Sequence, residues 1–189
     1  MIKQKIILAS QSPRRKQLLE WAEIEFEVIV PDTDESYPPE TSINEIAIHI
    51  ARNKALAVLE NYPGTLPILA ADTIVVCNND VIGKPVNKAD AISILSKLSG
   101  RDHQVITGVC ILNGMKEISF SDVTDVTFNE LSAEQIEFYI DKYKPYDKAG
   151  AYAIQEWIGV IGIKSVRGDF YNVMGLPVNR VVKALLQFD

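Results

Sequence analysis

The run from Ile68 to Val76 constrains the fold of this chain more than any other segment. Apart from Asp72 and Thr73, it is apolar on both sides of the alternation that a β-strand imposes on its side chains. A strand that is apolar on both sides is covered on both faces, which is typical of an α/β sheet flanked by helices. A carboxylate inside such a strand is costly unless it is ion-paired, hydrogen-bonded or bound to a metal. The run therefore predicts a buried strand and marks Asp72 as a candidate functional residue.

Strands and helices alternate along the first part of the chain. An apolar strand at residues 6–9 leads directly into a helix, with Ser12 as its N-cap and Pro13 at its first position. Residues 26–30 predict a second strand. A long helix then follows the capping-box signature Ser42–Glu45.

The second half of the chain predicts further helices and an antiparallel ribbon. Asn87 caps one helix, a capping box at Ser132–Gln135 opens another, and apolar spacing predicts a closing helix over residues 178–186. A strand at residues 103–112 and a return strand of about a dozen residues are joined at Asn113-Gly114, a strong hairpin signal. These elements predict the ribbon to be antiparallel.

The order of these elements predicts an α/β fold with a mixed sheet, flanking helices and an antiparallel ribbon. We expect one domain over residues 1–189, with the ribbon extending as a second lobe. Two lobes would leave a cleft, where small ligands usually bind. Near the C-terminal end, residues 151–154 are strand-like within a segment punctuated by glycines.

A basic turn follows the first strand. Arg14, Arg15 and Lys16 place three cations on the first turn of the helix that Ser12 caps. The amides of a helix N-terminus attract anions, while exposed cations there oppose the helix dipole by about 0.3–1 kcal/mol each. An anionic ligand would offset this effect, so the turn is typical of a phosphate site. The alternative is a solvated basic turn.

Charge and cysteine usage narrow the class of protein. The chain has 19 Lys and Arg residues against 25 Asp and Glu, a net charge of −6. Because non-specific binding to duplex nucleic acid rests on phosphate neutralisation, this balance argues against a nucleic-acid partner and favours a small anionic ligand.

Cys77 and Cys110 lie in apolar strand-like runs, so we expect buried free thiols in a reducing compartment. Without a signal-peptide pattern or an apolar run of roughly 20 residues, we expect a cytoplasmic protein with no membrane partner.

Three more polar residues stand at recognisable places in the predicted elements, but none of them alone indicates a binding site. Lys84 stands between Gly83 and Pro85, Lys54 lies on the polar side of the long helix, and Gln155 follows the strand-like residues 151–154. Each of these side chains, taken singly, is more typical of a solvated residue than of a ligand-binding one.

An acidic pair, Asp32 and Asp34, follows the second predicted strand. Such pairs occur in the nucleophile loop of dehalogenase-type phosphatases and in the metal-binding motif of sugar-transferring enzymes, although Ser36 stands where the phosphatase motif has Thr or Val. Neither His49 nor His103 has a second metal ligand at a suitable spacing, which favours structural roles for both.

Several blocks of sequence, read in order, carry a resemblance that extends from residue 9 to residue 177. They are Ala9–Arg15, Ala51–Ala55, Ala71–Val75, Gly83–Pro85, Leu98–Arg101, Asp147–Gln155 and Asn172–Pro177. In this order they resemble the Maf family. The resemblance implies the inosine triphosphatase-like fold and a nucleoside triphosphate pyrophosphatase that uses a divalent metal, Mg²⁺ or Mn²⁺.

The resemblance also implies roles for single residues. Asp72 matches the proton acceptor of the family, and Arg14, Thr73 and Gln155 match the positions that mark the branch hydrolysing dTTP and UTP. The branch acting on 7-methyl-GTP differs at residues 153–155. These matches imply a house-cleaning enzyme for canonical or modified pyrimidine nucleotides, with a possible link to cell-division arrest.

The residues themselves suit cleavage at the α-phosphorus, which needs mainly charge neutralisation at the phosphate oxygens. As hypotheses, Ser10, Arg14 and Arg15 bind the substrate, and Lys54 and Lys84 act as point charges on the leaving pyrophosphate. The carboxylate of Asp72 is a weak base on its own, with an ordinary aspartate pKa of about 3.9, and becomes effective toward a metal-bound water. Glu35 is the candidate for sharing that metal, and a homodimer is a further expectation.

The chain departs from the family pattern at Gln11, Asn53, Gly162 and Glu156-Trp157, which bear on loop shape and substrate fit. Two other functions stay open. One is a nucleotide-binding regulatory protein without turnover, and the other is a metal-dependent phosphatase or sugar-transferring enzyme built on Asp32 and Asp34.

Overall fold

The structure is a computed structural model that describes residue 2 and residues 4–188, and its chain folds into two compact units. Unit 1 comprises residues 1–72, 107–122 and 175–189, and unit 2 comprises residues 73–106 and 123–174. Each unit is described by itself.

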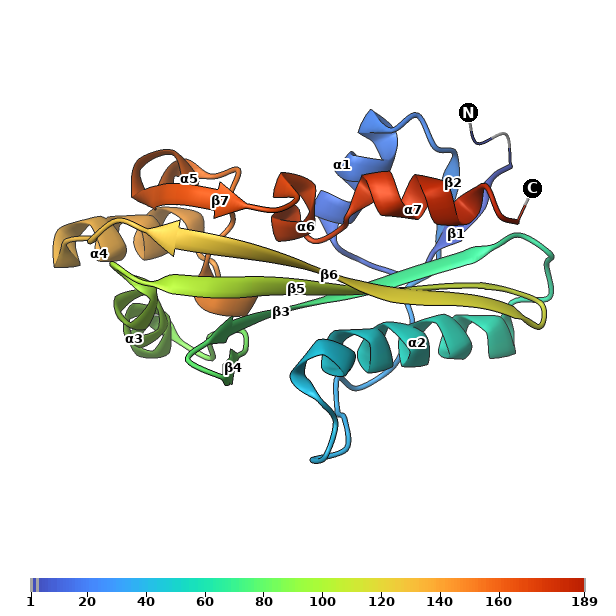
Figure 1. Cartoon of the computed structure of the whole chain (residues 1–189), viewed down its shortest axis with the longest axis horizontal. Helices are drawn as coiled ribbons and strands as arrows, with labels where there is room; N and C mark the ends of the chain where they lie inside the picture. Colours follow the sequence, from blue (N-terminus) through green and yellow to red (C-terminus); the bar gives the residue numbers. More distant parts are fainter. Residues whose placement is uncertain (1, 3, 189) are drawn as a thin grey trace. The chain divides into compact units, whose positions relative to one another are not determined.

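The elements follow the predicted alternation of strands and helices. In chain order they are β1 (Ile6–Leu8), α1 (Pro13–Trp21), β2 (Phe26–Val28), α2 (Ile43–Asn61), β3 (Ile68–Cys77), β4 (Asp80–Ile82), α3 (Lys88–Leu98), β5 (Asp102–Asn113), β6 (Lys116–Phe128), α4 (Ala133–Tyr143), the 3-10 helix η1 (Ala149–Ala151), α5 (Trp157–Gly162), β7 (Ile163–Arg167), α6 (Phe170–Met174) and α7 (Val178–Leu185) (Figure 1).

The described strands pair in the order β2-β1-β3-β5-β6-β7, with β4 beside β3. β1 is parallel to both β2 and β3, whereas β4 runs antiparallel to β3 and β7 antiparallel to β6. A mixed sheet with flanking helices, the predicted α/β fold class, is therefore confirmed.

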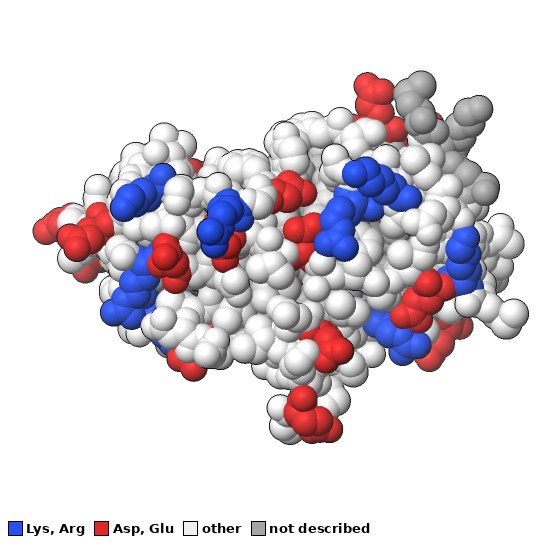
Figure 2. All heavy atoms as spheres, viewed as in Figure 1, with Lys and Arg blue, Asp and Glu red and all other residues white. Residues whose placement is uncertain are grey.

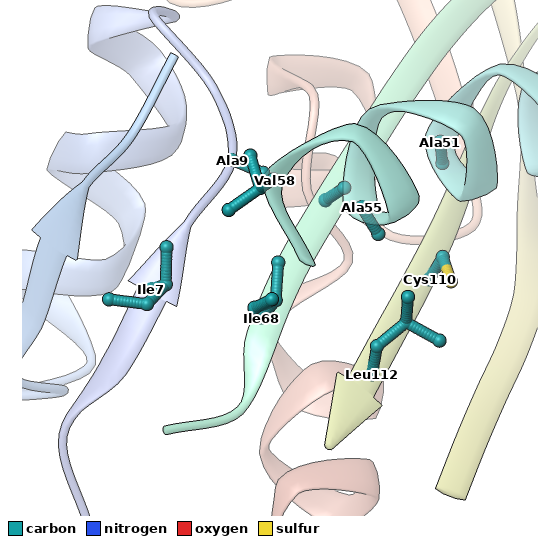
Figure 3. Packing of buried hydrophobic residues seen from close by; sticks show 9 residues of the cluster. Ile7, Ala9, Ala51, Ala55, Val58, Ile68, Cys110 and Leu112 are labelled. Atoms are coloured by element: carbon teal, nitrogen blue, oxygen red, sulfur yellow. The ribbon is translucent and has the colours of Figure 1, made fainter. Parts of the chain in front are cut away.

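The core of unit 1 lies between α2 and the strands (Figure 3). Ala51, Ala55 and Val58 recur at the spacing of one helix face, and the strand residues alternate, so each element contributes one apolar side. Small alanine side chains let the helix backbone approach the sheet closely. The cluster consists of Ile7, Ala9, Ala51, Ala55, Val58, Ile68, Ala70, Cys110 and Leu112.

Helix starts agree with the sequence in position but not always in bonding. Ser12 is the N-cap of α1 and Ser42 that of α2, yet neither side chain accepts the capping hydrogen bond. The Ser42 hydroxyl instead donates to the Glu45 carboxylate at 2.5 Å, so the predicted capping box of α2 is wrong in its bonds. The box at Ser132 and Gln135 forms in full, and Asn87 caps α3 through Asp90 N at 2.9 Å.

Two tight turns shape the ribbons. The β5–β6 turn consists of Gly114 and Met115, one residue later than the predicted Asn113-Gly114, and Gly114 has the positive φ of 58° that a primed turn needs at its first central position. In unit 2, the turn from β3 to β4 was not predicted from the sequence. Asn78 and Asn79 form it, with φ of 53° and 65°, both in the left-handed region that asparagine tolerates.

The segment after α4 differs most from expectation. The strand predicted at residues 151–154 is wrong, because Gly150 and Ala151 have φ of 70° and 57°, which no strand can accommodate. A 3-10 turn, a short helix and the edge strand β7 occupy residues 149–167 instead. The buried side chains Tyr152 and Ile158 attach this irregular segment to the core of unit 2.

The histidine and the two cysteines that were expected to be structural are all buried. They are His103, Cys77 and Cys110. His103 is buried with its ring in edge contact with those of Phe128 and Tyr152, and its Nε2 lies 2.8 Å from Tyr152 Oη in a hydrogen bond. Both cysteines are buried and free, as predicted, and burial raises the pKa of the Cys110 thiol to about 11. A thiol with so high a pKa is a poor nucleophile at neutral pH.

The surface carries both signs of charge. Lys and Arg side chains are interspersed with Asp and Glu on the face shown in Figure 2. Exposed ion pairs include Lys88–Asp141 at 2.7 Å and Arg52–Glu117 at 3.0 Å. Within the residues described, no helix combines the length and the apolarity that crossing a bilayer requires.

Candidate active site

Lys54 joins two carboxylates in unit 1. Its Nζ donates to Asp72 Oδ1 at 2.7 Å and to Glu35 Oε1 at 3.0 Å. The side chains of Lys54 and Asp72 are 12% and 10% exposed, whereas that of Glu35 is 43% exposed. Lys54 and Asp72 therefore form the buried pair. Glu35 is the more exposed of the two carboxylates that bond to the Lys54 ammonium.

The position of Asp72 follows from β3. The strand residues on both sides of it, from Ile68 to Cys77, are buried except for Thr73. A buried carboxylate needs a partner, because removing an ion from water costs several kcal/mol unless a charge or hydrogen bond compensates. α2 supplies that partner: the apolar face of Ala51, Ala55 and Val58 packs on the sheet and Lys54 projects from the turn between them.

Arg15 is anchored beside the first strand. Its Nε donates to the carbonyl of Gly175 at 2.8 Å and its Nη1 to Ser10 Oγ at 3.2 Å. Ser10 Oγ also accepts from the backbone N of Ser12 at 3.2 Å, so the serine stabilises the turn into α1. Two donors of the guanidinium are thus used by the protein, which fixes its orientation.

Neighbouring charges in unit 1 affect the pKa of Arg15. Burial, the largest cause, lowers the pKa of Arg15 from its ordinary value, and the charge of Arg14 lowers it further. Asp72 and Glu35 oppose this effect by raising it. An arginine keeps its proton at any physiological pH, so Arg15 stays a cation near two carboxylates. We call Arg14, Arg15, Glu35, Lys54 and Asp72 the charge cluster.

Thr73, Lys84 and Gln155 belong to unit 2. Thr73 follows Asp72 in β3 and is half-buried, and Lys84 is exposed after the end of β4. The carbonyl of Gly83 accepts from Gly150 N at 3.1 Å, which ties the Lys84 loop to η1. Gln155 is exposed, between η1 and α5, so its amide faces solvent rather than the core.

Comparisons with known proteins show the family of this chain. Residues 5–188 match the family model described as "Maf-like protein". The chain belongs to the Maf family. It is 52% identical over 95% of its length to a dTTP/UTP pyrophosphatase of Cytophaga hutchinsonii, of which it covers 82%. It is 50% identical over 98% of its length to the dTTP/UTP pyrophosphatase of Parabacteroides distasonis, of which it covers 97%.

A third relative, the dTTP/UTP pyrophosphatase of Phocaeicola vulgatus, is 52% identical over 97% of this chain and 95% of its own length. Among solved structures, the chain is similar over 98% of its length to the Ham1 protein of Staphylococcus aureus, at 17% identity, 99% coverage of that protein and a TM-score of 0.45. The fold class of this chain is given by its own strand order and strand pairing.

The Maf resemblance implied a divalent metal, and the donors in unit 1 fit one. Asp72 and Glu35 present carboxylate oxygens to a common point, at present the ammonium of Lys54. Within residues 2 and 4–188, no group of three or more His, Cys, Asp or Glu side chains could hold a metal by itself. Mg²⁺ is often held by one or two carboxylates together with substrate phosphates, and this pair suits that mode.

Lys148, Glu156 and Tyr139 of unit 2 were assigned no catalytic or binding role from the sequence, although Lys148 lies within a Maf-like block and Glu156 was expected to bear on loop shape. Lys148 is buried, and its Nζ lies 2.7 Å from Asp147 Oδ1 and 3.7 Å from Glu156 Oε1. Glu156 also accepts a hydrogen bond from Tyr139 Oη. The position of Lys148 among small residues could have marked it as a candidate. Tyr139 could not have been found in this way, because in the sequence it looks like any other residue of the apolar face of its helix.

Asp32 and Asp34 lie outside the regular elements of the Maf fold. Both side chains are exposed in the loop after β2, and Asp34 Oδ1 accepts from Ser36 Oγ at 3.0 Å. The nearby acidic residue that joins the charge cluster is Glu35, through Lys54.

Proposed function

We propose that this protein hydrolyses dTTP and UTP to the nucleoside monophosphate and pyrophosphate. One observation carries the proposal: a buried Lys54–Asp72 pair whose carboxylate acts electrostatically on Arg15, in a chain about half identical to relatives named dTTP/UTP pyrophosphatases. The fold positions these charges on α1, α2 and β3.

In the proposed reaction, a water oxygen attacks the α-phosphorus. The bond from that phosphorus to the bridging oxygen breaks, and pyrophosphate leaves with the electron pair. Asp72 accepts the proton of the attacking water. The hydrogen bond from Lys54 orients the carboxylate within the strand, which aligns the acceptor oxygen before the substrate arrives.

Positive charges stabilise the oxygens of the transition state. We assign this role to Arg14, Arg15, Lys54 and Lys84, with Ser10 holding Arg15 in place. An anchored guanidinium loses little orientational entropy when it meets a phosphate, so its contribution is realised at the moment of reaction.

We further propose that Asp72 and Glu35 hold a divalent cation, Mg²⁺ or Mn²⁺, together with the substrate. When bound, such an ion increases the acidity of a coordinated water and neutralises phosphate charge. Because both carboxylates now bond to Lys54, the ammonium must give up part of this contact when the ion enters.

We assign base recognition to Gln155, with Thr73 and Arg14 as the other specificity residues. A glutamine amide can donate to O4 and accept from N3–H of uracil or thymine. Cytosine reverses the donor and the acceptor at both positions. An unpaired polar group costs about 1–3 kcal/mol, enough for roughly ten- to hundred-fold discrimination.

The test is a panel of nucleoside triphosphates incubated with Mg²⁺, with Mn²⁺ and with a chelator. Metal-dependent release of pyrophosphate, fastest from dTTP and UTP, is the expected result. Orthophosphate as the product would favour a phosphatase built on Asp32 and Asp34. Nucleotide binding without any product would favour a regulatory protein.

The proposed function also includes the location, assembly and role of the protein: a cytoplasmic, homodimeric enzyme that removes canonical or modified pyrimidine nucleotides.

A further inference from the structure

The backbone on either side of Gln155 is bonded to a buried tyrosine of α4. Tyr139 is fully buried, and its Oη accepts from Ala153 N at 3.1 Å. The same hydroxyl donates a hydrogen bond to Glu156 Oε2. One side chain therefore joins the residue two positions before Gln155 to the residue directly after it.

Lys148 extends this network to the start of the segment. Its buried Nζ lies 3.7 Å from Glu156 Oε1, while Tyr139 bonds to the other oxygen of that carboxylate. Lys148 is the N-cap residue of η1 and Glu156 is the N-cap residue of α5. The interaction thus spans residues 148–156, which we call the Gln155 segment.

Close packing restrains the Gln155 segment from the side of α5. A Cβ atom at Gly159 would lie 1.7 Å from the carbonyl oxygen of Ile154, so the helix backbone touches the segment directly. Within the segment, Glu156 N donates to the Ala153 carbonyl at 3.1 Å. Ala153 and Ile154 are buried, whereas Gln155 between these restraints is exposed.

We propose that Tyr139, Glu156 and Lys148 are positioning residues, which fix the direction in which Gln155 presents its amide. The inference rests on the proposed function, in which that amide selects uracil and thymine over cytosine. Hydrogen bonds weaken steeply when donor and acceptor are misaligned. A loosened segment lets the amide turn, so selectivity falls while the charge cluster of unit 1 is unchanged.

The test is Tyr139→Phe, which keeps the ring and removes the hydroxyl that joins Ala153 to Glu156. The control is Tyr143→Phe on the same helix: the Tyr143 ring stacks on Tyr139 with centroids 5.0 Å apart, and the substitution likewise removes only a hydroxyl. Steady-state kinetics with UTP, dTTP and CTP give kcat and KM for each enzyme.

We expect Tyr139→Phe to lower the UTP-to-CTP ratio of kcat/KM by about tenfold, mainly through a higher KM for UTP. Tyr143→Phe should keep the wild-type ratio. An unchanged ratio in Tyr139→Phe, at a wild-type melting temperature, overturns the proposal.

Glu156→Gln is the second variant, in case Tyr139→Phe does not fold. The amide oxygen still accepts from Tyr139, but the charge toward Lys148 is lost, so we expect a smaller loss of selectivity, about threefold. A ratio equal to that of the wild type counts against the proposal.

Failure of the proposed function gives a different result. In that case the wild-type enzyme itself shows no preference for UTP over CTP, and the positioning role falls with it. If the wild type prefers UTP and Gln155→Glu removes the preference, but Tyr139→Phe and Glu156→Gln do not, only the positioning role is wrong.

Discussion

The charge cluster of unit 1 and the Gln155 segment of unit 2 present their functional groups in different ways. Lys54 and Asp72 project from the middle of a long helix and a buried strand, and each is the partner of the other. Gln155 projects from an irregular turn into solvent, and its neighbours hold the turn in place.

The difference matches the roles that we propose for the two groups. A buried charge requires a partner at hydrogen-bond distance, so it depends on regular elements that place the two at a constant separation. An exposed amide requires only a direction, which a turn can supply when its backbone is bonded to the core. We therefore expect substitutions in the charge cluster to affect the chemical step and stability, and substitutions around Gln155 to affect the choice of substrate.

Asp72→Asn has the largest expected effect. The amide keeps the shape of the side chain but cannot accept the proton, so kcat for UTP should fall by about 10³-fold, in the range of lost general-base catalysis. Nucleotide binding, measured by titration calorimetry, should be largely retained. The control is Asp32→Asn in the exposed loop. Near-normal turnover in Asp72→Asn removes this residue from the mechanism, and an equal loss in Asp32→Asn points to the phosphatase alternative.

Lys54→Met tests whether the buried pair also stabilises unit 1. Removing the ammonium leaves the Asp72 carboxylate buried without its partner, and we expect a loss of about 3 kcal/mol in the free energy of unfolding, measured in urea. Arg52→Met is the control, since Arg52 lies on the same helix in an exposed pair with Glu117 and should lose less than about 1 kcal/mol. Equal losses in the two variants contradict the distinction between buried and exposed charges.

Gln155→Glu tests recognition in unit 2. A carboxylate cannot donate to O4, so the preference for UTP and dTTP over CTP should fall by roughly ten- to hundred-fold. Gln135→Glu is a matched control, because glutamate also satisfies a capping box. An unchanged ranking of UTP, dTTP and CTP shows that Gln155 does not read the base.

His103 provides a test of how the stability of unit 2 depends on pH. Burial, the main cause, lowers the pKa of His103 from 6.5 to about 4, and the charge of Asp102 opposes this. Above pH 6.5 the ring is neutral in both states. Between pH 6.5 and about 4 the unfolded chain gains a proton that the folded chain does not. Stability should therefore fall over this window, by up to about 3 kcal/mol.

In His103→Phe this contribution to the pH dependence is absent. The variant should be less stable at pH 7, because Tyr152 Oη loses its hydrogen bond with the ring. Its free energy of unfolding should nevertheless fall less steeply between pH 6.5 and 4.5 than that of the wild type. The free energy of unfolding is measured in urea at several pH values. If it falls equally steeply with pH in the wild type and in His103→Phe, His103 is not the cause of the pH dependence.

Much of the fold could be predicted because its signals are local. The two-sided apolar run predicts β3, Ser12-Pro13 predicts the start of α1, and the hairpin signal is off by a single residue at Gly114-Met115. Residues 149–167 could not be predicted, because an alternation of small apolar residues there resembles a strand. Positive φ at Gly150 and Ala151, where Gly150 N donates to the distant Gly83 carbonyl, produces a different structure.

The sequence by itself indicated which groups are the candidates for the chemistry. The burial of Asp72 follows from the pattern of one strand, and the basic turn follows from a strand that leads into a helix. Only the tertiary structure decided their partners: Lys54 for Asp72, Gly175 and Ser10 for Arg15, and Tyr139 for the turn around Gln155. The physical reason is that periodicity reports which side of an element is buried, whereas a hydrogen bond between distant residues depends on how whole elements pack.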